Sequence, residues 1–292
     1  MENSSRLKVQ KTYKIFIDGK FPRSESGRCF EYPLPKTAGA SKMSVNVSLS
    51  SRKDLRDAVT AARNAQGKWA MASAYNRGQI LYRIAEMLEG RRSQFTEELT
   101  WQGVSEQQAR AEVTASVDRL VYYAGWSDKY QQLFSSVNPV ASSHFNFSML
   151  EPTGVVGIIG PESPALLGLI SLMAPIIIGG NSCVVLSSSS KPLSSVTFAE
   201  VLETSDVPAG VVNILTGKRE ELESSFASHM DLNSLAISSE DKSIASIEKA
   251  AADSVKRVHF YSQSKWSEES AQGPWMIHDH QEVKTVWHPI GG

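Results

Sequence analysis

A short turn near the middle of the chain carries two residue types that could do chemistry. The stretch IIGPESPALLG runs from Ile158 to Gly168, between a strand-like run and a long apolar helix-like run. In an α/β domain such a turn faces the ligand cleft, so Glu162 and Ser163 could act as an acid and a nucleophile. Ser163 has no visible histidine partner and lies in no Gly-x-Ser-x-Gly elbow, which argues against a serine hydrolase.

Other polar residues could bind a ligand. His278-Asp279-His280, with His288 nearby, could hold a metal if two imidazoles shared one side of a strand. The alternative, which we favour, is a polar, exposed segment without a metal. The run 187–190 (SSSS) could bind an anion through its hydroxyls, but we favour the alternative, a solvated loop.

The elements that must position these residues change along the chain. The first 135 residues are mostly helical, and Ser51 with Asp54 predicts a capping box that opens a helix. A hairpin is predicted at Tyr13–Phe21, around Asp18-Gly19. A helix from about residue 105 into the 120s is expected to place these residues on one face: Val113, Val117, Leu120, Val121 and Ala124.

From residue 154 the chain alternates between strands and helices. The predicted strands are Gly154–Ile159, Cys183–Leu186, Val211–Leu215, Ser234–Ile237 and Arg257–Phe260. The predicted helices are Pro164–Ile178, Pro192–Glu203, Arg219–His229 and Asp241–Ala251. This alternation predicts a Rossmann-like α/β fold, a parallel sheet with helices on both faces.

Two alternating segments flank this region. Phe145–Leu150 reads as an exposed strand, and Glu282–His288 reads as a second. Residues 261–280, which precede the second strand, are too few for another domain, and 262–272 read as a polar loop. Trp275 and Trp287 could be interface anchors or could pack in the ordinary way.

Composition excludes several classes of protein. The net charge of −1 gives no footprint for nucleic acid or a membrane surface. Cys29 and Cys183 suggest no disulfide framework, and the first residues have no apolar signal core, so we expect a cytoplasmic protein. The most apolar stretch, Leu166–Ile178, contains a proline and is too short to span a bilayer.

A series of segments points to a known family. In order they are DLRDAVTAARNA, RGQILYRIAEMLE, LVYYAGWSDKY, EPTGVVGIIGP, MAPIIIGGNSCVVL, VPAGVVNILTG, FASHMDL, SVKRVHF and EVKTV. With these segments the chain resembles the aldehyde dehydrogenase superfamily over nearly its whole length. It is most similar to the catalytically incomplete module of the fused, double-module branch called family 16.

The resemblance implies site residues that this chain replaces. Where the family has an Asn-Phe-Pro turn whose asparagine helps form the oxyanion hole, this chain has Glu162-Ser163-Pro164. An ionised carboxylate cannot donate the hydrogen bond that an oxyanion needs. Where the family has a lysine for the cofactor ribose, this chain has Ser187.

Further positions differ in the same way. The family's Gly-Ser-Thr turn, which meets the cofactor phosphates, corresponds to Ser239-Glu240-Asp241. The two acidic side chains are favourable at the start of a helix but repel a pyrophosphate. The family's catalytic glutamate follows the strand after which this chain continues with Tyr261.

The family's nucleophilic cysteine belongs to a catalytic domain inserted between the last core strand and the tail. This chain lacks that insertion, and neither Cys29 nor Cys183 aligns with the nucleophile. We therefore expect no catalytic residue, no metal and no cofactor. NAD or NADP is expected only if a residual cleft still binds it.

The family's oligomerisation sheet has counterparts here. It comprises a hairpin and a C-terminal strand, and it pairs with the catalytic domain of a neighbouring subunit. The residues expected to serve this purpose are Phe145, Phe147, Val283, Thr285 and Trp287. The expected partner is a second copy, giving a homodimer, or a full-length aldehyde dehydrogenase.

The resemblance and the missing residues together give one leading hypothesis. The chain is a pseudoenzyme that acts as a structural or regulatory subunit. The alternatives are a residual NAD(P)-binding module and an aldehyde dehydrogenase that borrows catalytic groups from a partner. We expect a mostly helical part over 1–137, an oligomerisation hairpin over 138–152, a Rossmann-like domain over 153–262, and a linker with the C-terminal strand over 263–292.

Overall fold

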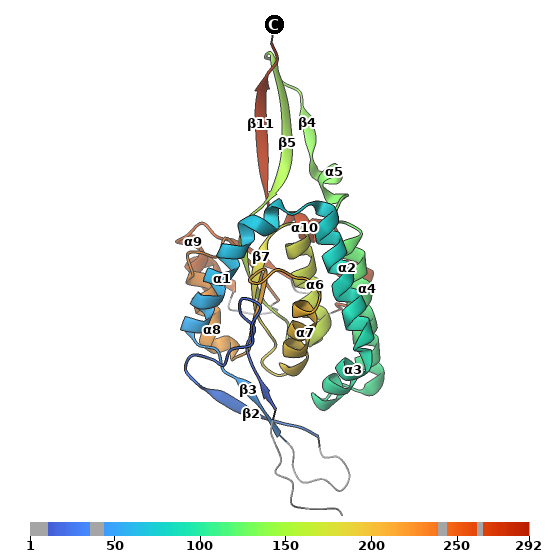
Figure 1. Ribbon diagram of the computed structural model, residues 1–292. Coiled ribbons are helices and arrows are strands. Elements are labelled where there is room, and N and C mark those ends of the chain that lie inside the picture. The colour runs from blue at the N-terminus through green and yellow to red at the C-terminus, as the bar shows by residue number, and fades with distance from the viewer. Residues whose placement is uncertain (1–10, 36–43, 239–243, 262–264, 292) are drawn as a thin grey trace, which may run out of the picture.

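A five-stranded parallel sheet forms the centre of the molecule (Figure 1). The computed structural model describes residues 11–35, 44–238, 244–261 and 265–291. In spatial order the strands are β10 (Arg257–Phe260), β9 (Ser234–Ile237), β6 (Val155–Ile159), β7 (Ser182–Leu186) and β8 (Val212–Leu215). The predicted α/β fold is confirmed. All residues of the three middle strands, β9, β6 and β7, are buried, as expected for a parallel sheet covered on both faces.

Helices cover both faces of this sheet. One face carries α1 (Arg52–Met71), α8 (Arg219–Ser228) and α9 (Ile244–Ala252). The other carries α6 (Ala165–Ile178) and α7 (Leu193–Glu203), and outside these lie α2 (Ala74–Gly90), α3 (Arg92–Trp101) and α4 (Glu106–Ala124). Alternate residues of each strand enter the two cores, so Val155 and Ile159 face α1 whereas Val156 and Ile158 face α6.

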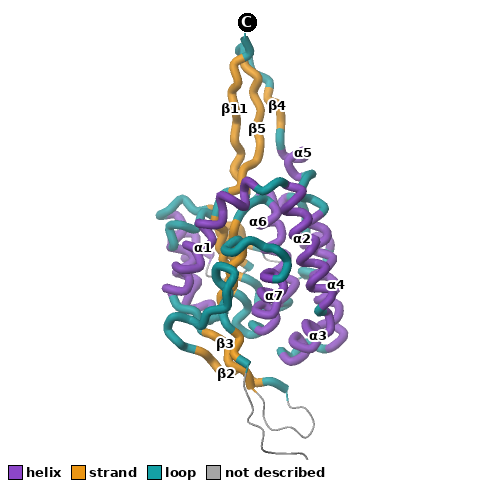
Figure 2. The backbone as a smooth tube through the Cα atoms, viewed as in Figure 1, coloured by secondary structure: helices purple, strands orange, loops and turns teal. Residues whose placement is uncertain are grey.

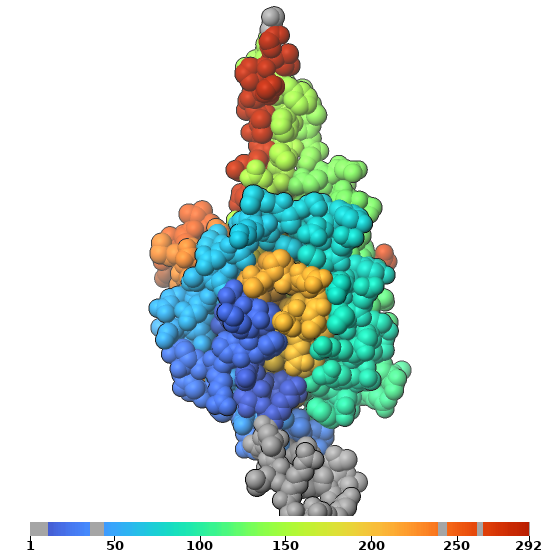
Figure 3. Space-filling model, viewed as in Figure 1, coloured from blue at the N-terminus to red at the C-terminus, as the bar shows by residue number. Residues whose placement is uncertain are grey.

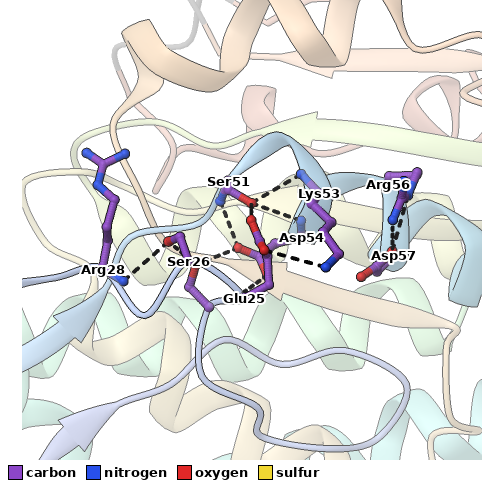
Figure 4. A network of polar contacts seen from close by, with 9 residues as sticks. Glu25, Ser26, Arg28, Ser51, Lys53, Asp54, Arg56 and Asp57 are labelled. Atoms are coloured by element: carbon purple, nitrogen blue, oxygen red, sulfur yellow. Dashed lines mark hydrogen bonds and ion pairs between the residues drawn. The ribbon is translucent and has the colours of Figure 1, made fainter.

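The predicted capping box opens α1 (Figure 4). Ser51 N donates to Asp54 Oδ2 over 2.7 Å, and Asp54 N donates back to Ser51 Oγ over 3.3 Å. Asp54 is buried and also accepts from the backbone N–H of Glu25 over 3.0 Å. The box therefore fixes the start of α1 and fastens the preceding chain to it.

The predicted buried face of α4 is wrong in part. The buried residues are Ala109, Glu112, Val113, Ser116, Arg119, Leu120 and Tyr123, while Val121 is exposed. Three polar side chains thus share the inner face, because each finds a hydrogen-bond acceptor or donor inside the molecule.

The hairpin predicted at Tyr13–Phe21 is a tight turn rather than a pair of strands. Ile17 and Lys20 exchange two backbone hydrogen bonds of 3.0 Å around Asp18 and Gly19, both at positive φ. Phe16 instead bridges to Ile214 of β8. A separate sheet contains β1 (Thr12–Tyr13), β3 (Ser44–Ser48) and β2 (Cys29–Pro33).

A second small sheet, here called the arm, projects from the end of the body opposite β2 and β3 (Figures 1 and 2). It contains β11 (Gln281–Pro289), β5 (His144–Pro152) and β4 (Ser136–Asn138), in that order and all antiparallel. The short helix α5 (Tyr130–Phe134) precedes it. Within the described residues, no helix is long and apolar enough to cross a membrane.

Residues 265–280, here called the connecting segment, lead into β11. They contain the 3₁₀ turn η1 (Glu269–Ala271) and the short helix α10 (Trp275–His278). A polar loop was expected up to residue 272, but Trp266 is only 1% exposed and Ala271 is fully buried. The connecting segment is therefore part of the folded body.

Candidate functional site

The site expected from the sequence lies where β6 and β7 end, at the carboxyl edge of the sheet. The turn Gly160–Pro164 follows β6, and Ser187–Ser190, here called the serine loop, follows β7. These strands are hydrogen-bonded neighbours, so the two turns meet. The peptide bond between Ser163 and Pro164 is cis.

Glu162 reaches across this edge into the serine loop. Its Oε2 accepts from Ser190 N over 2.9 Å, Ser190 Oγ over 2.6 Å and Ser188 Oγ over 2.9 Å. Its Oε1 accepts from Ser189 N over 3.1 Å. The loop therefore binds an anion as the serines suggested, but the anion is the chain's own carboxylate.

These hydrogen bonds keep Glu162 ionised. Partial burial acts to raise the pKa of its carboxyl, whereas the bonds from Ser190, Ser189 and Ser188 act to lower it. The net result is a pKa below the usual value, because four donors favour the charged form. Glu162 is therefore a hydrogen-bond acceptor at neutral pH and has no proton to donate.

Ser187 differs from the three serines after it. It is buried, and its Oγ has no hydrogen-bond partner among the residues that the structure describes. Its backbone N–H donates to Leu215 O over 3.0 Å, which continues the β7–β8 pairing. Ser187 thus lies within the sheet's end rather than on an open surface.

The first backbone N–H groups of α6 are also hydrogen-bonded to a side chain of the protein itself. Glu112 of α4 accepts from the backbone N–H groups of Leu166 and Leu167 over 2.8 and 3.2 Å. Free N–H groups at a helix start attract anions, and here a buried carboxylate already satisfies two of them. Glu112 was not predicted as a functional residue; its one signal in the sequence is a charged side chain next to Val113, which lies on the inner face of a predicted helix.

At the end of β10, Tyr261 joins a buried polar cluster. Its hydroxyl donates to Asp279 Oδ2 over 2.8 Å and lies 3.3 Å from His280 Nε2. The other ring nitrogen of His280 lies 2.9 Å from Ser234 Oγ on β9. Burial holds the pKa of His280 well below its usual value, with the nearby His259 and Arg257 acting in the same direction, so the imidazole is neutral.

This cluster is neither the metal site nor the polar, exposed segment that the sequence allowed for His278-Asp279-His280. His278 ends the helix α10 and His280 is 1% exposed, so the two imidazoles do not line one side of a strand or an exposed loop. Among the described residues, no three His, Cys, Asp or Glu side chains are grouped to hold a metal ion.

Arg119 of α4 fixes the connecting segment. Its guanidinium is buried and donates to Trp266 O over 2.8 Å, Ala271 O over 2.8 Å and Ser171 Oγ on α6 over 2.6 Å. Burial lowers the pKa of this group. Arg119 was also missed from the sequence, because two of its three acceptors are backbone atoms about 150 residues away along the chain and the third is a side chain on another helix.

The two cysteines lie far from each other in the fold and form no disulfide. Cys29 is exposed on β2, and Cys183 is fully buried in β7. Burial raises the pKa of the Cys183 thiol, which makes it a poor nucleophile. Ser239, Glu240 and Asp241, the expected replacements of the phosphate turn, lie outside the described residues.

The five residues expected to form an oligomer contact lie on opposite faces of the arm. Phe145 and Phe147 of β5 pair with His288 and Val286 of β11. Directly paired residues share a face, so Lys284 and His288 of β11 lie on this face as well. It is here called the apolar face after its apolar members: Val137, Phe145, Phe147, Met149 and Val286. Apart from the partly buried Phe147, all of these side chains are exposed.

Val283, Thr285 and Trp287 lie on the other face. That face carries a ladder of polar contacts: Asn138 donates to Asn146 Oδ1 over 2.6 Å and to Ser148 Oγ over 2.9 Å, and Ser148 Oγ lies 2.9 Å from Thr285 Oγ1. The ring of Trp287 packs edge-on against His144, with 5.8 Å between centroids. The polar groups of this face are therefore largely satisfied within the arm.

Comparison with known proteins agrees with this architecture. Residues 26–279 match the aldehyde dehydrogenase family. The putative aldehyde dehydrogenase DhaS of Bacillus subtilis is 31% identical over 264 residues, which cover 88% of this chain and 52% of that protein. The human cytosolic 10-formyltetrahydrofolate dehydrogenase is 30% identical over 86% of this chain and 28% of its own length.

Solved structures give the same result. A mutant aldehyde dehydrogenase from Bacillus cereus superposes with a TM-score of 0.79 at 27% identity, covering 86% of this chain and 50% of that one. The chain spans about half the length, or less, of the curated relatives it matches. The inserted catalytic domain is absent, because residues 261–280 alone join β10 to β11. The chain belongs to the aldehyde dehydrogenase family.

Proposed function

We propose that this chain is a non-catalytic member of the family that acts as a structural or regulatory subunit. The observation that carries the proposal is the bonding of Glu162 to the serine loop. The resemblance puts the oxyanion donor of the family at this position. A carboxylate with a lowered pKa repels a developing oxyanion instead of stabilising it.

The other reactive positions support the same proposal. Where the resemblance puts the family's general base, this chain continues with Tyr261. Its hydroxyl donates a hydrogen bond to Asp279, and burial raises its pKa well above the usual value. Such a group cannot accept a proton at neutral pH. Burial raises the pKa of the Cys183 thiol, and neither cysteine aligns with the nucleophile that the resemblance implies.

We also propose that the carboxyl edge does not hold NAD or NADP. A dinucleotide brings a negatively charged pyrophosphate, and the two anion-binding features identified here already contain the carboxylates of Glu162 and Glu112. Ser187, at the position of the family's ribose lysine, is buried and uncharged. The residues present do not fit the cofactor, and calorimetric titration with NAD⁺ and NADP⁺ up to millimolar concentration should give no binding heat.

The arm supports a docking role. Its apolar face combines exposed aromatic and aliphatic side chains, and β11 is an edge strand of nine residues. Exposed edge strands and apolar patches are typical of protein–protein contacts. We propose a full-length aldehyde dehydrogenase as the partner, because the family's arm docks on a catalytic domain, which a second copy of this chain lacks. A homodimer is the alternative.

We place the protein in the cytoplasm. Both cysteines are free thiols and one of them is exposed, which suits a reducing compartment. Localisation of the tagged chain by cell fractionation tests this assignment.

The experiment that tests the function combines activity and assembly. The purified chain is assayed for NAD(P)-linked oxidation of short aldehydes, alone and mixed with a full-length aldehyde dehydrogenase from the same organism. We expect no turnover by the chain alone, co-elution with the homologue, and an altered rate or stability of that homologue. Turnover by the chain alone would contradict the proposal.

A further inference from the structure

The arm is attached to the body through His280, the residue directly before β11. Its side chain is buried, with Nδ1 2.9 Å from Ser234 Oγ on β9 and Nε2 3.3 Å from the hydroxyl of Tyr261, which follows β10. Its carbonyl accepts from Asn181 Nδ2 over 2.9 Å. This one residue therefore connects the start of β11 to two neighbouring strands of the central sheet.

The groups of β10 near His280 are a cation and a second imidazole. Arg257 donates from Nη1 to Gln281 O and from Nη2 to Glu282 Oε2, each over 2.6 Å, so its guanidinium lies beside residues 280–282, here called the arm root. The ring of His259 is 4.9 Å from the ring of His280 between centroids. Both groups oppose a positive charge on the imidazole of His280.

The two carboxylates near the arm root are bonded to other groups. Asp279 Oδ2 accepts from the hydroxyl of Tyr261 over 2.8 Å, and Glu282 is paired with Arg257. Within the part of the chain that the structure describes, both ring nitrogens of His280 have hydroxyl partners and neither has a carboxylate. A charged imidazole in this position would therefore be buried without a counter-ion, which is unfavourable.

We propose that His280 makes the attachment of the arm pH-dependent, because proton uptake by its imidazole favours release of the arm root from the central sheet. A released imidazole has a pKa near 6.5, so the released state gains up to about 25-fold in population between pH 7 and pH 5. This regulation rests on the proposed function, in which the arm is the docking surface. Association weakens in acid because a released arm must be ordered again on binding.

Amide hydrogen exchange of the chain alone tests the attachment, measured at pH 7 and pH 5 and corrected for the intrinsic pH dependence of exchange. We expect the amides of β11 to be less protected than those of the buried strand β6, and to lose about fivefold to 25-fold of their protection at pH 5. His280→Gln should remove this loss, whereas His288→Gln, exposed on the same strand, should keep it. Protection of β11 equal to that of β6, or equal at the two pH values, would overturn the proposal.

A second measurement tests the link to docking. The affinity for a full-length aldehyde dehydrogenase from the same organism is compared at pH 7 and pH 5, for the wild type and for His280→Gln. Because the partner is the same, its own response to acid cancels, and the wild type should weaken at least about fivefold more than the variant. Equal weakening would overturn the regulation. Absence of a complex at pH 7 would contradict the proposed function instead, and the exchange measurement alone would then decide the attachment.

Discussion

Both carboxylate oxygens of Glu162 accept hydrogen bonds from the serine loop, so this one residue links the turn after β6 to the turn after β7. The sequence indicated an acid in one turn, whereas for the serines of the other turn anion binding was the less favoured alternative to a solvated loop. Their contact could not be predicted, because it depends on β6 and β7 being neighbours in the sheet.

Glu162→Gln should lower the free energy of unfolding by about 1 kcal/mol, because a charged acceptor is replaced by a neutral amide at a partly exposed site. In the wild type, the contribution of the ionised Glu162 to the free energy of unfolding is present at neutral pH. It disappears as the pH falls through the lowered folded-state pKa, because the unfolded chain takes up the proton more readily. Urea unfolding at pH 7 and at about pH 3 measures both effects. Glu86→Gln, at an exposed position of α2, is the control and should change little.

The same position offers a test of chemistry. Glu162→Asn restores the residue that the resemblance places at the oxyanion turn, yet the base and the nucleophile are still missing. We expect no aldehyde oxidation from this variant in the absence of a partner, measured by NADH formation. Measurable turnover would show that the lost chemistry depends on this one residue.

Arg119 makes the second residue-scale prediction. Arg119→Met leaves the buried carbonyls of Trp266 and Ala271 without their donor, which should cost about 2–4 kcal/mol of unfolding free energy. Cleavage within residues 265–280 by a protease should also become faster. Arg83→Met, which removes an exposed pair with Asp206, should cost less than about 1 kcal/mol. Equal losses in the two variants would contradict the role given to Arg119.

At the scale of elements, the strands and helices after residue 154 follow the sequence closely. Apolar runs between turn residues locate β6, β7, β8, β9 and β10 within one residue at each end. The inner face of α4 and the connecting segment were predicted wrongly because polar groups pair inside the fold. Arg119 donates to backbone carbonyls of residues 265–280, Glu112 accepts from the start of α6, and Ser116 donates to the carbonyl of Glu112. Such pairing leaves no periodic signal in the sequence.

The connecting segment also makes the fold sensitive to acid. His280 is buried and neutral, with the hydroxyls of Ser234 and Tyr261 at its two ring nitrogens and with His259 and Arg257 nearby. Its folded-state pKa is depressed, so the unfolded state binds the proton first as the pH falls below about 6.5. Stability should therefore drop between pH 7 and pH 5, by at most about 2 kcal/mol from this residue alone.

Urea unfolding of the wild type and of His280→Gln at the two pH values checks this expectation. The variant should be less stable at pH 7 but should lose less stability on acidification. His288→Gln, on the exposed end of β11, is the control and should keep the wild-type dependence. A wild-type stability that is constant from pH 7 to pH 5 would contradict the account.

At the scale of the whole molecule, the arm stands out because the chain itself does not cover its apolar side chains. It projects beyond the body (Figure 3). The apolar side chains of Val137, Phe145, Met149 and Val286 on it are exposed. The sequence predicted β5 and β11 from their alternation, but not β4, whose three residues carry too little pattern. Alternation along β11 separates Val283, Thr285 and Trp287 from Val286, but which residues of β5 join each face follows from the register between the two strands.

Two valines of β11 provide a matched pair for the arm. Val286 lies on the apolar face and Val283 on the opposite face of the arm, three residues apart on the same edge strand. Val286→Asp puts a charge into the proposed contact and should weaken association at least tenfold, whereas Val283→Asp should have a smaller effect. Light scattering during size-exclusion chromatography, over a concentration series, compares them. Equal effects would contradict docking through the apolar face.

The central claim is that this family member works by assembly and not by catalysis. The most direct measurement is the native mass of the chain, whose protomer weighs 32.0 kDa, alone and mixed with a full-length aldehyde dehydrogenase from the same organism. We predict a complex with that homologue, or failing that a dimer, and its loss in Val286→Asp. A wild-type chain that stays at the protomer mass in both samples would contradict the account.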